Sequence, residues 1–270
     1  MVNGAGARPP AGSPRRLGQN FLADTNLLDA IVREADLAED DVVLEVGGGG
    51  GALTERIEPA VRWLHVIELD ERLRPELEPV AAGGGIDLIW GDAMDVDLSR
   101  LAPQPNKMVA NLPYSIATPL LVRTITELPS METWVVMVQR EIGDRLRAKP
   151  GTREYGSATV IVQLACEVTM LRAVDPAVFV PRPRVGSALL RLRRRHDGAS
   201  SDLAALVRLA FAHRRKSLAG SLELARAGSR EPARRALEAI GKPADARAET
   251  LSPEDFERFA EALSREAAAG

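Results

Sequence analysis

The chain alternates short runs of aliphatic residues with segments of helical spacing, and this alternation most restricts the folds open to it. Runs rich in Val, Ile and Leu are typical of strands buried on both faces of a parallel sheet. Between several of these runs, apolar residues recur every three or four positions, as on one face of a helix. The predicted strands are Val42–Val46, Leu64–Leu69, Ile86–Trp90, Lys107–Ala110 and Thr133–Val138, and the clearest helices among them are Pro119–Leu128 and Arg140–Leu146. We therefore expect a doubly wound α/β sheet.

The two ends of the chain differ from this alternating region. The Gly-, Ala- and Pro-rich residues 1–14 are predicted to be a disordered tail, and a helix capped by Asp24 or Thr25 precedes the first strand. Two further runs, Ala158–Val168 and Val185–Leu192, are predicted to be strands that finish the sheet in an order left open. The chain then becomes rich in Ala, Leu and Arg. The predicted domains are a main domain at 15–197 and a small helical domain at 198–270.

Composition excludes several classes of protein. The single cysteine, Cys166, permits neither a disulfide framework nor a cysteine zinc site, and it fits a reducing, cytoplasmic setting. The longest apolar runs, Trp134–Val138 and Thr159–Leu164, fall far short of the roughly 20 residues that cross a bilayer. We therefore expect a cytoplasmic protein with no membrane span.

The formal net charge of -3 hides a strongly basic segment. Residues 179–226 contain 11 Lys and Arg residues against three Asp and Glu residues, a net charge of +8, so the rest of the chain carries -11. A basic block of this kind is typical of a surface that binds phosphate groups. A solvated face of charges would give the same pattern, so charge alone leaves the partner open.

Three predicted strand ends carry residues that suit an adenosine-like ligand. Glycines 47–51 follow the first strand, and Gly47 and Gly49 let backbone N–H groups approach a ligand closely. Glu68, 21 residues beyond Gly47, ends the next strand, where a carboxylate can accept hydrogen bonds from both hydroxyls of a ribose. Asp92 follows the third strand and can accept from the amino group of an adenine. A tight turn and two loop caps would use the same residue types.

The turn Asn111-Leu112-Pro113-Tyr114 follows the fourth strand and suits a reaction at an exocyclic amine of adenine. The lone pair of that nitrogen is delocalised into the ring. The Asn111 side-chain oxygen and the Leu112 carbonyl can accept from the amine hydrogens and favour a pyramidal nitrogen, while Pro113 fixes the chain and Tyr114 offers a stacking face. Attack on a sulfonium methyl needs no metal or strong base, so we expect no metal. Turns with Asn and Pro are common, so this turn indicates the chemistry only because it follows the glycine loop, Glu68 and Asp92 in strand order.

In this order, the motifs closely resemble the KsgA-type ribosomal RNA adenine dimethyltransferases. The resemblance runs from residue 17 to about residue 222. It is carried by Leu17-Gly18-Gln19-Asn20-Phe21-Leu22, Glu45–Gly51, Val66-Ile67-Glu68-Leu69-Asp70, Gly91-Asp92-Ala93, Asn111–Tyr114, Phe179–Val185 and His213-Arg214-Arg215-Lys216-Ser217-Leu218. It implies a Rossmann-like sheet that binds S-adenosylmethionine, with the methyltransferase domain at 15–197 and a C-terminal RNA-binding domain at 198–270.

The resemblance also implies a role for each matched residue. The catalytic residues would be Asn111, Leu112, Pro113, Tyr114 and Phe179, with Phe179 as a second aromatic wall for a flipped base. The S-adenosylmethionine contacts would be Gln19, Asn20, Leu22, Gly47, Gly49, Glu68, Leu69, Asp92, Ala93 and Asn111, and the RNA contacts Arg182, Arg184, Arg214, Arg215 and Lys216. Gly48 departs from the family, which commonly has proline at that position.

The substrate implied by the resemblance is a pair of adjacent adenosines in the 3′-terminal hairpin loop of small-subunit rRNA, each dimethylated at N6. The partner would be that rRNA or the 30S precursor particle, bound by a monomer during small-subunit biogenesis. Two alternatives stay open. One is the related class that dimethylates an adenine in large-subunit rRNA and confers macrolide resistance, although His213–Leu218 resembles the small-subunit enzymes more. The other is a ribosome-assembly factor that has kept the fold without the reaction.

Overall fold

The described residues, 21–22, 24–195 and 200–269 of a computed structural model, form two compact units. One unit holds the chain up to Gly143 together with Val168–Arg194, and the other holds Asp144–Glu167 together with the chain from Arg195 onward. The predicted tail at 1–14 and the predicted domain boundary at 197–198 lie outside the described residues. The main domain predicted at 15–197 included the segment 144–167. In the structure, this segment clusters with the C-terminal helices.

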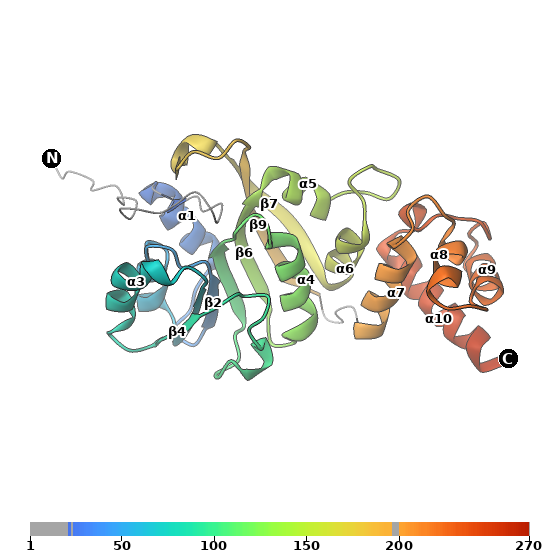
Figure 1. Cartoon of the computed structure of the whole chain (residues 1–270), viewed down its shortest axis with the longest axis horizontal. Coiled ribbons are helices and arrows are strands. Elements are labelled where there is room, and N and C mark those ends of the chain that lie inside the picture. The colour runs from blue at the N-terminus through green and yellow to red at the C-terminus, as the bar shows by residue number, and fades with distance from the viewer. Residues whose placement is uncertain (1–20, 23, 196–199, 270) are drawn as a thin grey trace. The chain divides into compact units, whose positions relative to one another are not determined.

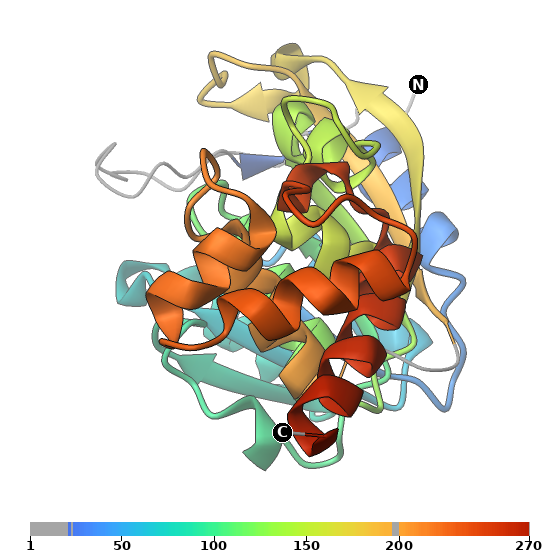
Figure 2. The same ribbon diagram turned by 90° about the vertical axis from the view of Figure 1, so that its right-hand side faces the viewer.

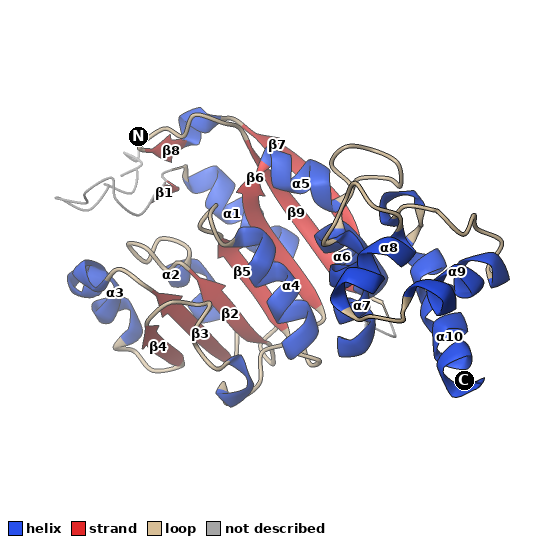
Figure 3. Ribbon diagram, turned by 45° about the vertical axis from the view of Figure 1, so that its right-hand side comes forward, coloured by secondary structure: helices blue, strands red, loops and turns tan. Residues whose placement is uncertain are grey.

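The first unit is built on a seven-stranded sheet with the order β4-β3-β2-β5-β6-β9-β7 (Figure 1, Figure 3). Its strands are β2 (Val42–Val46), β3 (Trp63–Glu68), β4 (Ile86–Trp90), β5 (Lys107–Asn111), β6 (Thr133–Gln139), β7 (Cys166–Val174) and β9 (Ser187–Arg194). The neighbours from β4 to β6 are all parallel, whereas β9 runs antiparallel to β6. The predicted α/β fold is thereby confirmed, and its open strand order is resolved: β9 lies between β6 and β7.

Helices precede, join or follow the parallel strands. They are α1 (Thr25–Ala35), α2 (Thr54–Ile57), α3 (Arg74–Ala81), α4 (Ala117–Glu127) and α5 (Arg140–Leu146), the last of which crosses the boundary between the units. A separate two-stranded sheet pairs β1 (Phe21–Leu22) with β8 (Phe179–Val180), so residues far apart in sequence lie side by side (Figure 3).

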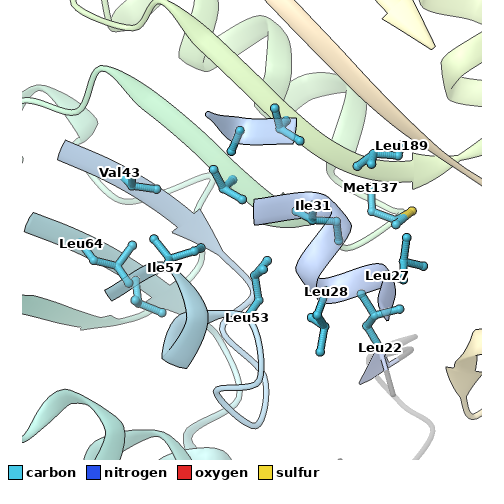
Figure 4. Close-up of a cluster of buried hydrophobic side chains, with 14 of the residues drawn as sticks. Leu22, Leu27, Leu28, Ile31, Val43, Leu53, Ile57, Leu64, Met137 and Leu189 are labelled. Atoms are coloured by element: carbon cyan, nitrogen blue, oxygen red, sulfur yellow. The ribbon is translucent and has the colours of Figure 1, made fainter. Parts of the chain in front are cut away.

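The helix α1 supplies one side of the core of this unit. It begins where predicted, because the side chain of Asp24 accepts a hydrogen bond from the backbone N of Leu27 at 2.9 Å. Figure 4 shows its residues Leu27, Leu28 and Ile31 among the buried side chains of the sheet and of the segment leading into α2. Each of the three is at most 4% exposed. Their burial stabilises the unit by roughly 1.5–3 kcal/mol per side chain.

The second unit is helical (Figure 2). Its helices are α6 (Ser157–Ala165), α7 (Ser201–Phe211), α8 (Leu218–Ala225), α9 (Arg230–Ala239) and α10 (Pro253–Ala269). The buried rings of Tyr155, Phe211 and Phe256 form an aromatic core. The ring centroid of Phe211 lies 6.1 Å from that of Tyr155 and 5.9 Å from that of Phe256. In the described part of the chain, no helix has the length and apolar character to cross a membrane.

The strand predicted at Ala158–Val168 is wrong over most of its length, because Ser157–Ala165 is the helix α6 and β7 begins only at Cys166. The β-branched residues favoured a strand in the sequence. In the structure, the Thr159 hydroxyl accepts from the backbone N of Gly156 at 3.2 Å and donates to the Arg145 carbonyl at 2.9 Å, which fixes the start of a helix. Tertiary contacts therefore override the local preference.

Candidate active site at the carboxyl edge of the sheet

Parallel strands bring four of the predicted site residues to one edge of the sheet. Gly47 follows β2, Glu68 ends β3, Asp92 lies two residues beyond β4 and Asn111 ends β5. These strands are neighbours in the order β4-β3-β2-β5, and the loops are tied to the adjacent strand ends. The backbone N of Gly47 donates to the Ile67 carbonyl at 2.8 Å, and that of Gly91 donates to the Glu68 carbonyl at 2.9 Å.

The glycine loop lies directly against the turn after β5. Gly47 has φ +83°, and a Cβ built there would lie 3.4 Å from Pro113 Cδ and 3.6 Å from the Asn111 carbonyl oxygen. A Cβ at Gly49, which has φ +58°, would lie 3.4 Å from the Phe21 ring. At Gly48, a Cβ would meet Val66 Cγ1 at 2.6 Å, so Val66 fills the space that a side chain would need. The loop therefore presents bare backbone next to Asn111 and Pro113.

The Glu68 carboxylate is held in a fixed orientation. Its side chain is 4% exposed, and its two oxygens accept from the backbone N of Gly49 at 2.9 Å and of Asp70 at 2.8 Å. An ionised carboxylate oxygen has two lone pairs, so each keeps one for a further donor. This arrangement fits a ribose with two hydroxyls. The neighbouring Leu69 is 51% exposed.

The loop after β4 turns around Asp92. One carboxylate oxygen, Oδ1, accepts from the backbone N of Met94 at 2.8 Å, and the Asp92 carbonyl accepts from Asp95 and Val96 at 2.9 and 3.0 Å. Within the described part of the chain, no hydrogen bond reaches Oδ2, so that atom can accept from an adenine amino group. Ala93 is buried, at 4% exposed.

Arg123 of α4 holds the same loop and was missed in the sequence. Its guanidinium donates to the carbonyls of Ala93 and Met94, each at 2.8 Å, and of Val96 at 2.7 Å. It lies 31 residues beyond Asp92 in sequence. Nothing in the local sequence around Arg123 signals this contact, because the spacing between the two segments has no fixed period.

The turn that begins at Asn111 is anchored at several points. Leu112 is buried, and its backbone N donates to the Met137 carbonyl at 3.1 Å, while the Pro113 carbonyl accepts from Ile116 at 3.1 Å. The Tyr114 hydroxyl lies 2.7 Å from Ser187 Oγ of β9. Burial raises the pKa of Tyr114, and the hydrogen bond with Ser187 offsets part of that rise. The Tyr114 phenol is thus held neutral in a fixed position.

Phe179 lies in the core. In the small sheet it pairs with Leu22, and both side chains belong to the buried cluster that includes Val174 and Leu189. Phe179 is 2% exposed, so its ring is covered in this structure. Gln19 and Asn20 lie outside the described residues. The structure therefore brings Leu22 and Phe179 together without presenting an open second aromatic face.

Glu45 is a buried acid whose environment the sequence did not reveal. It is 1% exposed in β2, and its Oε2 accepts from the Thr54 hydroxyl at 2.7 Å. Burial raises the pKa of Glu45 to about 8, with the Thr54 hydrogen bond opposing and the nearby Glu68 adding to the rise. A carboxylate inside an otherwise apolar strand was the available signal.

The predicted RNA contacts fall in both units. Arg182 and Arg184 of the first unit are exposed, and Arg182 lies 3.7 Å from Asp175. In the second unit, Arg214 donates to the carbonyls of Arg153 at 3.2 Å and Tyr155 at 3.1 Å. Its guanidinium is thus partly committed to holding two segments of that unit together.

Arg215 and Lys216 follow Arg214 and are exposed, with no ion pair to another described residue. The hydrogen bonds of Arg214 bring this turn next to the segment 147–153, which carries the exposed side chains of Arg147, Lys149 and Arg153. Those three side chains lie outside the basic block, so the charge pattern of the sequence did not indicate them. Among the residues described, no group of three or more His, Cys, Asp and Glu side chains is placed to hold a metal ion.

Comparisons with known proteins give one consistent result. The family model described as ribosomal RNA adenine dimethylase matches residues 13–264. A relative from Rubrobacter xylanophilus, named ribosomal RNA small subunit methyltransferase A, is 43% identical over 90% of this chain and 92% of its own length. A relative of the same name from Clostridium acetobutylicum is 37% identical over 93% of this chain and 94% of its own.

Two solved structures share the fold over nearly the whole chain. A dimethyladenosine transferase from Plasmodium falciparum has a TM-score of 0.78 at 24% identity and covers 92% of this chain and 98% of its own. The 23S rRNA methyltransferase ErmE has a TM-score of 0.65 at 29% identity and covers 91% of this chain and 100% of its own.

Proposed function

Since the chain belongs to the ribosomal RNA adenine dimethylase family, we propose that it dimethylates N6 of two adjacent adenosines in the 3′-terminal hairpin loop of small-subunit rRNA, with S-adenosylmethionine as methyl donor. The observation that carries this proposal is the contact between the glycine loop and the reacting turn. A Cβ built at Gly47 would lie 3.4 Å from Pro113 Cδ and 3.6 Å from the Asn111 carbonyl oxygen, so a donor on the loop and an amine on the turn would be neighbours.

The residues of the sheet edge fit S-adenosylmethionine. Glu68 would accept from the ribose hydroxyls with its two remaining lone pairs, and Asp92 Oδ2 would accept from the adenine amino group. Gly47 and Gly49 leave room for the methionine part next to the backbone. When bound, the cofactor supplies an electrophilic methyl group on a sulfonium.

The turn at 111–114 would prepare the target amine. The Asn111 side-chain oxygen and the Leu112 carbonyl would accept the two hydrogens of the unmethylated amine, which would draw its lone pair out of the ring. The proton that the amine loses on methylation would pass to water. Tyr114, fixed by Ser187, would stack on the base. Phe179 can serve as a second wall only if its covering residues move aside.

We propose that the RNA is held mainly through its phosphates. In the second unit, Arg215 and Lys216, together with Arg147, Lys149 and Arg153, offer exposed cations, and Arg182 and Arg184 do so in the first unit. The partner would be a 30S precursor particle, and the chain would act as a cytoplasmic monomer in small-subunit biogenesis. Such binding should weaken steeply as salt rises.

The large-subunit reaction is the nearest alternative. The relatives named for the small subunit are 37 and 43% identical to this chain, against 29% for ErmE, which favours the small subunit. A non-catalytic assembly factor would have no need for the arrangement of Glu68, Asp92 and Asn111. The two rRNA substrates can be compared directly by incubating isolated small and large subunits side by side with the chain and labelled S-adenosylmethionine. We expect label in the small subunit; label only in the large subunit would overturn the proposal.

A further inference from the structure

The helix α4 connects the two halves of the proposed site. It begins at Ala117, directly after the turn at 111–114, and the Ile116 carbonyl at its start accepts from the backbone N of Leu120 at 2.8 Å. Two turns further along, Arg123 reaches the loop after β4. The same rigid element thus starts at the target turn and supports the loop that carries Asp92.

Nearly all of the hydrogen-bonding capacity of Arg123 is used in this support. Its Nη1 donates to the carbonyls of Ala93 and Met94 at 2.8 Å and its Nη2 to that of Val96 at 2.7 Å. Its Nε donates to Glu127 Oε2 at 2.8 Å, and its side chain is only 16% exposed. The guanidinium is therefore held in place by Glu127 and bonds to three carbonyls of one short loop, those of Ala93, Met94 and Val96.

These bonds fix the part of the loop that orients the Asp92 carboxylate. The carboxylate of Asp92 is oriented by the backbone N of Met94, and the carbonyl of Met94 is in turn held by Arg123. We propose that Arg123 is a positioning residue that sets Asp92 for recognition of the adenine amino group of S-adenosylmethionine. This inference rests on the proposed function, because it assigns the ligand of the same site.

An arginine suits this position better than a lysine. The planar fork of the guanidinium presents separate nitrogens to carbonyls that lie apart, whereas an ammonium is a single point. Arg123→Lys should therefore recover only part of what Arg123→Ala loses. Losing the bonds to a partly buried loop should weaken cofactor binding about tenfold in the alanine variant.

A matched control lies in the same unit. Arg194 also donates to three backbone carbonyls, those of Met131 at 2.5 Å and of Ile125 and Leu128 at 3.0 Å, none of which belongs to the loop after β4. Arg194→Ala removes these three hydrogen bonds, and Arg123→Ala removes three from the loop. A general loss of rigidity would affect both variants alike.

The test is calorimetry on the full chain with two ligands, S-adenosylhomocysteine and its analogue with hypoxanthine in place of adenine. We expect the wild type and Arg194→Ala to bind the adenine compound with similar Kd and to prefer it. In Arg123→Ala, the Kd for the adenine compound should rise about tenfold while that for the analogue changes little, so the preference falls.

Different outcomes separate the inference from the proposed function. Wild-type chain that binds neither compound would overturn both. Wild-type binding with an unchanged preference in Arg123→Ala, or an equal loss for both ligands in that variant, would overturn the role of Arg123 alone. If circular dichroism shows that the alanine variant is unfolded, Arg123→Lys, which keeps the charge and the aliphatic stem, takes its place with the same criterion.

Discussion

A methyl group added at Gly47 tests the contact on which the proposed reaction depends. Gly47 has φ +83°, where an L residue costs about 1–2 kcal/mol. The new Cβ would lie 3.4 Å from Pro113 Cδ and 3.6 Å from the Asn111 carbonyl oxygen, which is ordinary van der Waals contact and adds no steric cost. Gly47→Ala should therefore lower the free energy of unfolding by about 1–2 kcal/mol while filling the space next to the reacting turn.

Gly84→Ala is the matched control for that strain. Gly84 has φ +87° and no atom within 4 Å of its Cβ position, so it carries the same backbone cost away from the site. The chain has three tryptophans, all in the first unit, so their fluorescence follows the unfolding of that unit. We expect equal destabilisation in the two variants, but a Kd for S-adenosylmethionine raised at least about tenfold in Gly47→Ala only. Equal cofactor affinity in both variants would refute the reasoning.

Three further predictions concern the amine, the buried acid and the RNA. Asn111→Ala should abolish methyl transfer while leaving RNA binding nearly unchanged in a filter-binding assay, and full activity in that variant would contradict the mechanism. Because burial raises the pKa of Glu45 from 4.5 to about 8, the folded chain keeps a proton there that the unfolded chain releases; this stabilisation is complete below pH 4.5 and is lost as pH rises through about 8. The unfolding free energy of the wild type should therefore be lower at pH 8 than at pH 5, and this difference should be smaller in Glu45→Gln. Equal differences in the two proteins would assign the pH dependence to other groups. Reversing the charge at Arg215 and Lys216 should weaken RNA binding and reduce the slope of log affinity against log salt by about one for each lost phosphate contact, while cofactor binding stays unchanged. An unaltered salt slope would remove these two residues from the interface.

The grouping of the candidate site residues at one edge of the sheet could be predicted because these residues follow strands in a regular order. Gly47, Glu68, Asp92 and Asn111 each come at the end of an aliphatic run, and the ends of parallel strands meet at one edge of a sheet. The strand periods and the chemistry of these four residues were therefore enough to group them. The side on which β9 joins the sheet was not encoded in any local pattern, because it depends on pairing between strands far apart in the chain.

The helix α6 shows where local preference fails. Thr159, Val160, Ile161 and Val162 are β-branched or aliphatic in sequence and all are buried in the structure. A helix buried on nearly every side has no polar face, so it lacks the period that distinguishes a helix from a buried strand. Its start is fixed by the Thr159 hydroxyl, which accepts from the backbone N of Gly156 and donates to the Arg145 carbonyl in another segment.

The side chains that support the candidate site could not be predicted from the sequence either, because their contacts join segments that are far apart in the chain. A candidate ligand-binding carboxylate such as Asp92 can be identified by its place after a strand, but the group that orients its loop needs only a long reach and several donors. Arg123 and Arg214 both use the guanidinium in this way, across 30 and 61 residues respectively when measured to Ala93 and to Arg153. A charged residue in a basic block can therefore hold two protein segments together as readily as it can contact a phosphate. The distinction depends on which backbone carbonyls lie within its reach. For Arg214, the bonds to the carbonyls of Arg153 and Tyr155 favour the structural role, whereas Arg215 and Lys216 make no ion pair with another described residue.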